Sequence, residues 1–148
     1  MSLPCKWMPE VKLGIQAKQV WTMQAMPRIP LISIIDDDEA IRRSLDDLIR
    51  SAGLRARVFS SAEAFLQSNQ MSEIDCLILD LCLPGMSGLE LQRQLAEDNF
   101  DLPIILMTAH ESGDQRRQAV EAGAVAFLNK PFEEADLLNA IDRALKAM

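Results

Sequence analysis

Residues 31–38 read LISIIDDD, a short apolar run that ends in three aspartates. Three later stretches have the same form, because each passes from apolar residues to a polar residue that can handle a phosphoryl group or a metal. These stretches read LILD at 77–80, IILMT at 104–108 and FLNK at 127–130. The carboxyl ends of the strands in a parallel α/β sheet open on one edge, where ligands bind. We therefore expect acids, a hydroxyl and an ammonium to converge there.

Strand and helix signals alternate from residue 31 onward. Apolar runs of strand length are separated by stretches with apolar residues at helical spacing. No hairpin signal occurs, so the economical fold is α/β, a doubly wound parallel sheet of five strands covered by five helices. Spacing alone does not give the strand order, but the flavodoxin-like order 2-1-3-4-5 would seat strand 1 beside strand 3. The strands are expected at 31–35, 54–59, 76–79, 103–107 and 125–129. Three helices are expected to begin after caps at Asp38, at Ser60 or Ser61, and at Ser87. A fourth helix is expected to end at Gly123, and the last helix carries Leu137 to Leu145.

Length and composition limit what this domain can be. The chain has 148 residues, 49% of them hydrophobic, which is enough for one domain with an ordinary core. Its net charge of −7 argues against an electrostatic nucleic-acid binder. No run reaches the length of a membrane span, no secretory signal is present, and the three cysteines lack paired metal-ligand spacing. We expect a cytoplasmic protein without membrane contact, a disulfide framework or a zinc site.

The composition changes near Pro27 to Pro30. Residues 1–30 hold four basic residues and one acidic residue, so the acidic charge of the chain lies in the remainder. Met26 lies just before the first strand signal and is a candidate natural start. We interpret residues 1–30 as an N-terminal extension, either a tag or a mis-assigned start, and residues 31–148 as the functional domain.

The expected strand order makes Asp36, Asp37 and Asp80 neighbours. Two carboxylates about 4 Å apart repel by roughly 4 kcal/mol at an effective dielectric near 20, so an ionised trio needs a cation or a proton. Ligands that are all oxygen suit Mg²⁺ better than zinc. Helix capping accounts for Asp38 and is an alternative for Asp36 and Asp37. Asp80 favours the metal site, because it closes an apolar strand and enters a loop rich in proline and glycine.

A carboxylate beside a bound metal, with a hydroxyl and an ammonium nearby, can take a phosphoryl group as an acyl phosphate. Phosphoryl transfer needs little beyond in-line positioning and neutralisation of the charge on the equatorial oxygens. Taken singly, Thr108 is typical of a turn residue and Lys130 of a solvated lysine. The convergence of several strand ends favours Asp80 as the reacting group and Thr108 and Lys130 as the residues that assist it.

These residues resemble those of a known family, the receiver domains of two-component response regulators, over about residues 31–147. The resemblance extends to receivers of the nitrogen-fixation and nitrate-response type, through the pattern SAEAFL at 61–66. The matching motifs are the acid pair Asp36-Asp37, DLCLPGMSG at 80–88, Thr108-Ala109, AGA at 122–124 and Lys130-Pro131-Phe132.

The resemblance implies a role for each residue of the metal site. Asp80 corresponds to the phosphoacceptor, Asp37 to a direct Mg²⁺ ligand, and Asp36 to an acid that acts largely through metal-bound water. The backbone carbonyl of Cys82 would complete the ligands that the protein supplies.

The phosphoryl-binding residues are implied in the same way. Thr108, Lys130 and the backbone N–H of Ala109 correspond to the groups that bind the aspartyl phosphate, and Lys130-Pro131 corresponds to a cis peptide. Thr108 and Phe127 are similar to the family's hydroxyl and aromatic switch, which would remodel the face made by the fourth helix, fifth strand and fifth helix.

The implied partners are a sensor histidine kinase or a histidine phosphotransfer protein. A homodimer through the switch face is a further expectation, whereas direct nucleic-acid binding by this chain is not expected. The domain would be regulatory rather than an enzyme, and it would catalyse only its own phosphorylation and dephosphorylation. No output domain follows the fifth helix, so the chain is either a stand-alone receiver or, as SAEAFL slightly favours, one cut from a longer regulator.

Two other classes of function stay open. A haloacid-dehalogenase-type phosphatase also uses an aspartyl nucleophile, but it places that residue after its first strand with a second Asp two residues later, where this chain has Cys82. A phosphorylation-independent interaction module is the other alternative. The intact set Asp36, Asp37, Asp80, Thr108 and Lys130 argues against that module.

Overall fold

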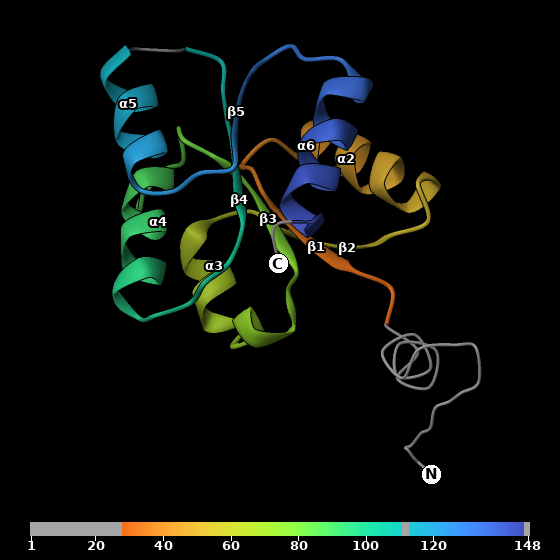
Figure 1. The fold of residues 1–148 in the computed structure, drawn as a ribbon, viewed down its shortest axis with the longest axis horizontal. Helices are drawn as coiled ribbons and strands as arrows, with labels where there is room; N and C mark the ends of the chain where they lie inside the picture. Colours follow the sequence, from red (N-terminus) through yellow and green to blue (C-terminus); the bar gives the residue numbers. More distant parts are fainter. Residues whose placement is uncertain (1–27, 111–112, 147–148) are drawn as a thin grey trace, which may run out of the picture.

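The computed structural model describes residues 28–110 and 113–146, and within them five parallel strands form one sheet. The strand order is β2-β1-β3-β4-β5, so the expected flavodoxin-like order is confirmed and β1 lies directly beside β3 (Figure 1). The strands are β1 (Leu31–Ile35), β2 (Arg55–Phe59), β3 (Cys76–Asp80), β4 (Ile104–Thr108) and β5 (Ala126–Asn129).

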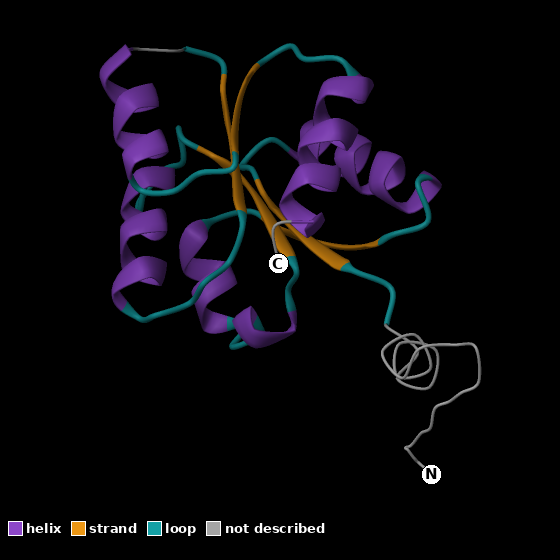
Figure 2. Ribbon diagram, in the orientation of Figure 1, coloured by secondary structure: helices purple, strands orange, loops and turns teal. Residues whose placement is uncertain are grey.

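Helices cover both faces of this sheet (Figure 2). One face carries α3, α4 and α5, and the other carries α2 and α6, as Figure 1 shows. In the described residues, no helix is long and apolar enough to cross a membrane. The helices are α2 (Glu39–Ser51), α3 (Ala62–Gln67), α4 (Gly88–Glu97), α5 (Gly113–Glu121) and α6 (Glu134–Lys146), with a short 3₁₀ helix at Met71–Glu73.

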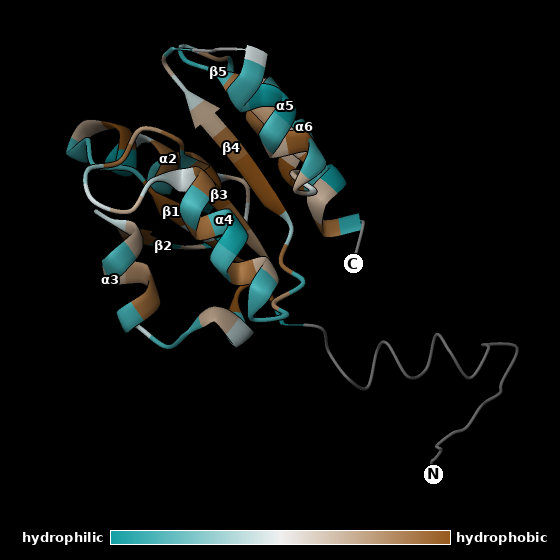
Figure 3. Ribbon diagram, turned by 90° about the vertical axis from the view of Figure 1, so that its left-hand side faces the viewer, coloured by the Kyte–Doolittle hydropathy of each residue, from teal (hydrophilic) through white to brown (hydrophobic). Residues whose placement is uncertain are grey.

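The central strands β1, β3 and β4 are buried along their whole length because helices cover both sides of the sheet, whereas the edge strands β2 and β5 are only partly buried. Successive side chains of β1 alternate between the two core layers: Leu31 and Ile35 pack with α3 and α4, whereas Ile32 and Ile34 pack with α2 and α6. Figure 3 shows the apolar strands in the interior and polar outer helix surfaces. Two apolar layers therefore fix the sheet, and the polar residues at its carboxyl edge are the exceptions.

Helix caps lie where the sequence predicts them. Asp38 caps α2 by accepting a hydrogen bond from the backbone N–H of Ala40 at 2.8 Å. Ser61, rather than Ser60, caps α3, and Ser87 opens α4 in a reciprocal capping box with Glu90. Each of these caps starts the helix that follows a strand. The early start of the helix limits the length of the loop at the carboxyl edge.

Two boundaries differ from the predicted ones in a way that matters for the site. β3 and β4 each extend one residue further, so that Asp80 and Thr108 are the last residues of their strands and not loop residues. Ladder pairing continues to both positions, with Asp80 opposite Met107 and Thr108 opposite Asn129. The backbones of Asp80 and Thr108 are therefore held by the sheet itself. Residues 1–27 of the predicted N-terminal extension lie outside the described residues.

Candidate phosphoryl and metal site

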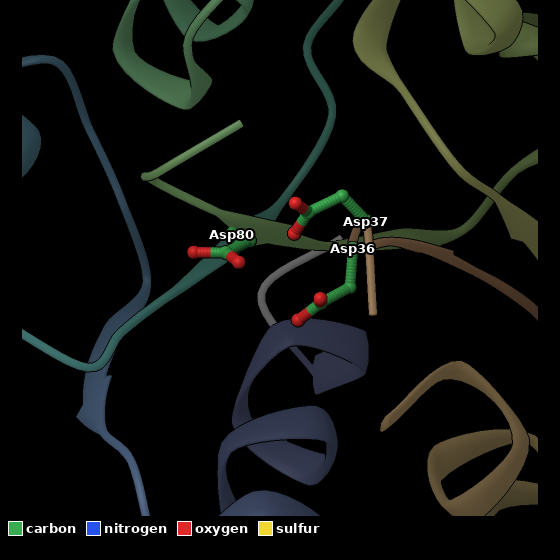
Figure 4. Close-up of side chains that lie close together, drawn as sticks. All are labelled: Asp36, Asp37 and Asp80. Atoms are coloured by element: carbon green, nitrogen blue, oxygen red, sulfur yellow. The ribbon is translucent and has the colours of Figure 1, made fainter. Parts of the chain in front are cut away.

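Three carboxylates meet at the carboxyl edge of the sheet, where β1 and β3 end side by side. Oxygen atoms of Asp36, Asp37 and Asp80 all lie within 4.8 Å of one another (Figure 4). Asp36 and Asp80 are buried, with exposed fractions of 0% and 4%, whereas Asp37 is exposed. The site therefore has two buried acids at its floor and one acid at its opening.

Lys130 bridges the two buried acids. Its Nζ donates to Asp36 Oδ2 at 2.7 Å and to Asp80 Oδ2 at 3.1 Å. The residue follows β5 at the far edge of the sheet, and its peptide bond to Pro131 is cis, as the resemblance implies. The Lys130 ammonium consequently lies where it can contact any group attached to the Asp80 carboxylate.

Burial and neighbouring charges shift the pKa values of two groups in the site. Burial raises the pKa of the Asp80 carboxyl, although the Cys82 amide and the Lys130 charge partly oppose that shift. Burial alone would lower the pKa of Lys130, but its hydrogen bond to Asp36 and the charge of Asp80 outweigh burial and raise it. Lys130 is therefore a permanent cation at neutral pH.

The donor set fits a hard divalent cation. One ammonium faces three carboxylates, and the half-buried Arg42 adds a guanidinium that donates to the Asp36 carbonyl oxygen at 2.7 Å. The three carboxylates offer only oxygen atoms as ligands. Two of the carboxylates lie at neighbouring strand ends and the third is exposed to solvent, which suits Mg²⁺ with several retained waters. Asp36, Asp37, Asp80 and the Cys82 carbonyl are the groups that could hold it.

The loop after β3 is tied to the Asp80 carboxylate. The backbone N–H of Cys82 donates to Asp80 Oδ1 at 3.0 Å, and the Cys82 side chain is exposed. Asp36 has a matching turn, because its Oδ1 accepts from the backbone N–H of Asp38 at 2.9 Å. Both buried acids thus have one oxygen held by the backbone two residues on and the other held by Lys130.

The expected hydroxyl lies at the next strand end but points to its own loop. The buried Thr108 hydroxyl accepts from the His110 backbone N–H at 3.1 Å and donates to the His110 carbonyl oxygen at 3.2 Å. Ala109, between them, is exposed. On β5, Phe127 is half-buried, and the Arg116 guanidinium lies 5.2 Å from its ring centroid. The structure brings Asp36, Asp37, Asp80 and Lys130 together. The Thr108 hydroxyl and the Phe127 ring lie beside this cluster and contact other groups, His110 and Arg116.

Two residues of this region were not predicted from the sequence. Arg42 binds the Asp36 carbonyl, and Glu63 binds the loop after β3 through the Met86 backbone N–H. Arg42 lies six residues after Asp36 on the next helix, so its proximity could have been inferred from helical geometry. Glu63 had no such signal, because it reaches a loop more than 20 residues away.

The fold and the site together define a class of protein. It is a doubly wound α/β domain with an acid cluster and a lysine at the carboxyl edge of its sheet. Within that class, the chain belongs to the response regulator receiver domain family, whose model matches residues 32–142. The predicted family and fold are thereby confirmed.

Curated relatives support this membership. The chain is 48% identical to the response regulator protein TmoT of Ectopseudomonas mendocina over 116 residues, which is 78% of this chain and 53% of the relative. It is 37% identical over 120 residues to the transcriptional regulatory protein FixJ of Azorhizobium caulinodans, covering 81% of this chain and 57% of FixJ. The chain thus spans about half the length of the curated relatives it matches.

Solved structures give the same result. The crystal structure titled FixJ-N matches with a TM-score of 0.74 and 35% identity, covering 82% of this chain and 98% of that one. The response regulator StyR matches with a TM-score of 0.76 and 42% identity, covering 81% of this chain and 61% of that one. The described domain therefore corresponds to a nearly complete FixJ-N chain.

Proposed function

We propose that this domain accepts a phosphoryl group on Asp80 from the phosphohistidine of a sensor histidine kinase or a histidine phosphotransfer protein in the cytoplasm. The observation that carries the proposal is the shared contact of Lys130 with Asp36 and Asp80 beside the exposed Asp37. This arrangement provides a fixed acceptor, a cation at the acceptor oxygen and a ligand set for Mg²⁺.

In the transfer, an Asp80 carboxylate oxygen forms a bond to phosphorus while the bond from phosphorus to the donor imidazole nitrogen breaks. Mg²⁺, when bound by Asp36, Asp37, Asp80 and the Cys82 carbonyl, supplies positive charge to the oxygens of the transferring group. Lys130 lies 3.1 Å from Asp80 Oδ2, so its ammonium would bind the oxygens of a phosphoryl group attached to Asp80. The buried backbone of β3 keeps the acceptor in line.

Release of the Thr108 hydroxyl from His110 converts this event into a change of surface. Both hydrogen bonds between Thr108 and His110 are longer than 3 Å, and they would be exchanged for bonds to phosphoryl oxygens, with the Ala109 N–H assisting. The space vacated by Thr108 would admit the Phe127 ring from the adjacent strand. The surface of α5, β5 and α6 would then differ between the two states and could support a homodimer.

A docking surface for the phosphodonor lies beside the site. A pocket of about 470 Å³ opens next to Lys130 and is mainly apolar, with Ile41, Leu45, Pro131 and Phe132 among its lining residues. A helical partner that presents a histidine to Asp80 would cover this pocket. The domain's role is regulatory, and its chemistry is limited to gaining and losing its own phosphoryl group.

Intact mass measurement after incubation with Mg²⁺ and acetyl phosphate tests the proposal. We expect a phosphoryl adduct on the wild type that is labile to base, and none on Asp80→Ala or when Mg²⁺ is chelated. A folded wild type that binds Mg²⁺ but gains no adduct would replace the proposal with a phosphorylation-independent interaction module. Turnover of an unrelated phosphomonoester would instead favour a phosphatase.

A further inference from the structure

Glu63 joins helix α3 to the loop that follows the acceptor strand. The residue lies in the first turn of α3, and its Oε2 accepts a hydrogen bond from the backbone N–H of Met86 at 2.8 Å. Helix α3 supplies no residue of the carboxylate site. The contact therefore links the loop to a part of the fold that is separate from the site.

The loop is shaped to receive this carboxylate. Gly85 has a φ of +75°, and a Cβ added there would lie 2.5 Å from Glu63 Oε2, so the carboxylate fills the place of the missing side chain. Three residues later, a Cβ on Gly88 would lie 2.5 Å from the Asp80 carbonyl oxygen. Glycine is therefore favoured at Gly85 by its positive φ and at Gly88 by the close approach of the Asp80 backbone.

The segment held by Glu63 leads back to the proposed metal ligand. Leu81 and Leu83 are buried in the core, and the partly buried Met86 side chain packs against it. Pro84 and Gly85, between Leu83 and Met86, are exposed, so core packing holds the two ends of the turn and not the turn itself. Cys82 lies between the two leucines and donates its N–H to Asp80 Oδ1. The exposed turn that Glu63 holds begins at Pro84, two residues after Cys82, so a change in this turn acts on the chain next to the Cys82 carbonyl.

We propose that Glu63 is a positioning residue for the phosphoryl site, which fixes the loop from α3 so that the Cys82 carbonyl is oriented for Mg²⁺. This inference rests on the proposed function. Glu63 touches neither metal nor phosphoryl group, and it acts through the backbone of Met86. The hydrogen bond, rather than the negative charge, is the interaction that matters.

Three variants separate hydrogen bonding from charge. Glu63→Ala removes both the acceptor and the charge, whereas Glu63→Gln removes the charge and keeps an amide oxygen that can accept from Met86. Glu97→Ala is the matched control, because Glu97 is an exposed acid at the end of α4, and its loss changes the net charge equally. Thermal unfolding of all three verifies that the fold is retained.

The measurements are Mg²⁺ affinity by calorimetry, amide exchange at Met86 without Mg²⁺, and the rate of phosphorylation by acetyl phosphate as Mg²⁺ is varied. For Glu63→Ala we expect faster exchange, Mg²⁺ affinity weaker by about three- to ten-fold, and a rate that recovers at saturating Mg²⁺. Glu63→Gln and Glu97→Ala should resemble the wild type in all three measurements.

Wild-type Mg²⁺ affinity in folded Glu63→Ala would overturn the role of Glu63 and leave the proposed function intact. Equal loss in Glu63→Gln and Glu63→Ala would also overturn it, because the effect would then be one of charge. A wild type that binds no Mg²⁺ would overturn the proposed function, and the positioning role with it.

Discussion

The Lys130 ammonium lies 2.7 Å from an Asp36 carboxylate oxygen, although the two residues are 94 positions apart in the chain. The side chain of Asp36 is fully buried and that of Lys130 is 15% exposed, so this ion pair is largely shielded from solvent. Lys130 also contacts Asp80, which means that one cation stabilises two buried acids. The pair therefore joins the first strand to the end of the last and forms part of the site at the same time.

Lys130→Met should lower the free energy of unfolding by roughly 3 kcal/mol, because it leaves two buried carboxylates without their shared cation. Mg²⁺ should recover more stability in this variant than in the wild type, since it would replace the lost positive charge. Urea denaturation with and without Mg²⁺ measures both effects. Equal Mg²⁺ responses in the two proteins would contradict the prediction.

Lys146→Met is the control for that experiment. Lys146 pairs with Asp142 at 2.9 Å, but both side chains are exposed, with fractions of 76% and 61%. Exposed pairs of this kind contribute about 0–1 kcal/mol. A control variant as unstable as Lys130→Met would show that loss of a lysine, and not loss of the buried contact, is responsible.

Gly88→Ala should disturb the end of β3, because the added Cβ would lie 2.5 Å from the Asp80 carbonyl oxygen and 2.9 Å from the Leu81 Cα. Both are backbone atoms and cannot move aside as a flexible side chain would. We expect destabilisation of about 1–3 kcal/mol in urea denaturation and slower phosphorylation of Asp80.

Gly113→Ala is the matched comparison for Gly88→Ala. Gly113 also begins a helix, but a Cβ there would meet nothing within 4 Å. Reduced freedom of the unfolded chain should stabilise this variant by up to about 1 kcal/mol. If the two variants were equally stable, the close approach at Gly88 would have no energetic consequence.

The sequence was sufficient for the fold class and the order of elements along the chain because local signals and global topology agree here, whereas spacing alone did not give the strand order. Asp38, Ser61 and Ser87 start their helices, and β3 and β4 are short apolar runs that end in a polar residue. The strand ends were less certain: nothing local distinguishes Asp80 or Thr108 as the last strand residue from the first loop residue. Their extra ladder pairing comes from the neighbouring strands, which a linear pattern does not show.

The candidate site was predictable as a set of residues but not as a network. Topology alone implies that Asp36, Asp37 and Asp80 converge, and the distances among their oxygens agree with that prediction. The contact of Lys130 with Asp36 in addition to Asp80 depends on side-chain geometry. The same holds for Glu63, whose hydrogen bond depends on how α3 packs beside the loop after β3.

Arg116→Ala should make the proposed switch at Phe127 easier to operate. The Arg116 guanidinium lies 5.2 Å from the Phe127 ring centroid, and a cation over an aromatic ring at an exposed site contributes about 0.5–1 kcal/mol. Losing it lowers the cost of turning the ring inward, so we expect a two- to five-fold higher population of the inward state, within about that energy range.

Fluorine NMR of a protein labelled with fluorophenylalanine measures this population, with Phe127→Leu used to assign the Phe127 signal. Arg116→Lys keeps a cation and should lie between wild type and Arg116→Ala. An inward population that is unchanged in Arg116→Ala would show that the contact does not hold the ring.

Alkaline pH should destabilise the domain through Cys76, which lies in β3 and is fully buried. Burial, aided by the charge of Asp75, raises the pKa of the thiol from 9.0 to about 12. The unfolded chain loses this proton first, so the stability that the neutral thiol contributes is complete below pH 9 and is lost as pH rises toward 12. By about pH 10.5 the loss should reach roughly 2 kcal/mol.

Urea denaturation at pH 8 and 10.5 measures this loss of stability, and Cys76→Ala should lack this component because its cavity cost is independent of pH. An identical pH dependence in the two proteins would mean that Cys76 does not carry the effect.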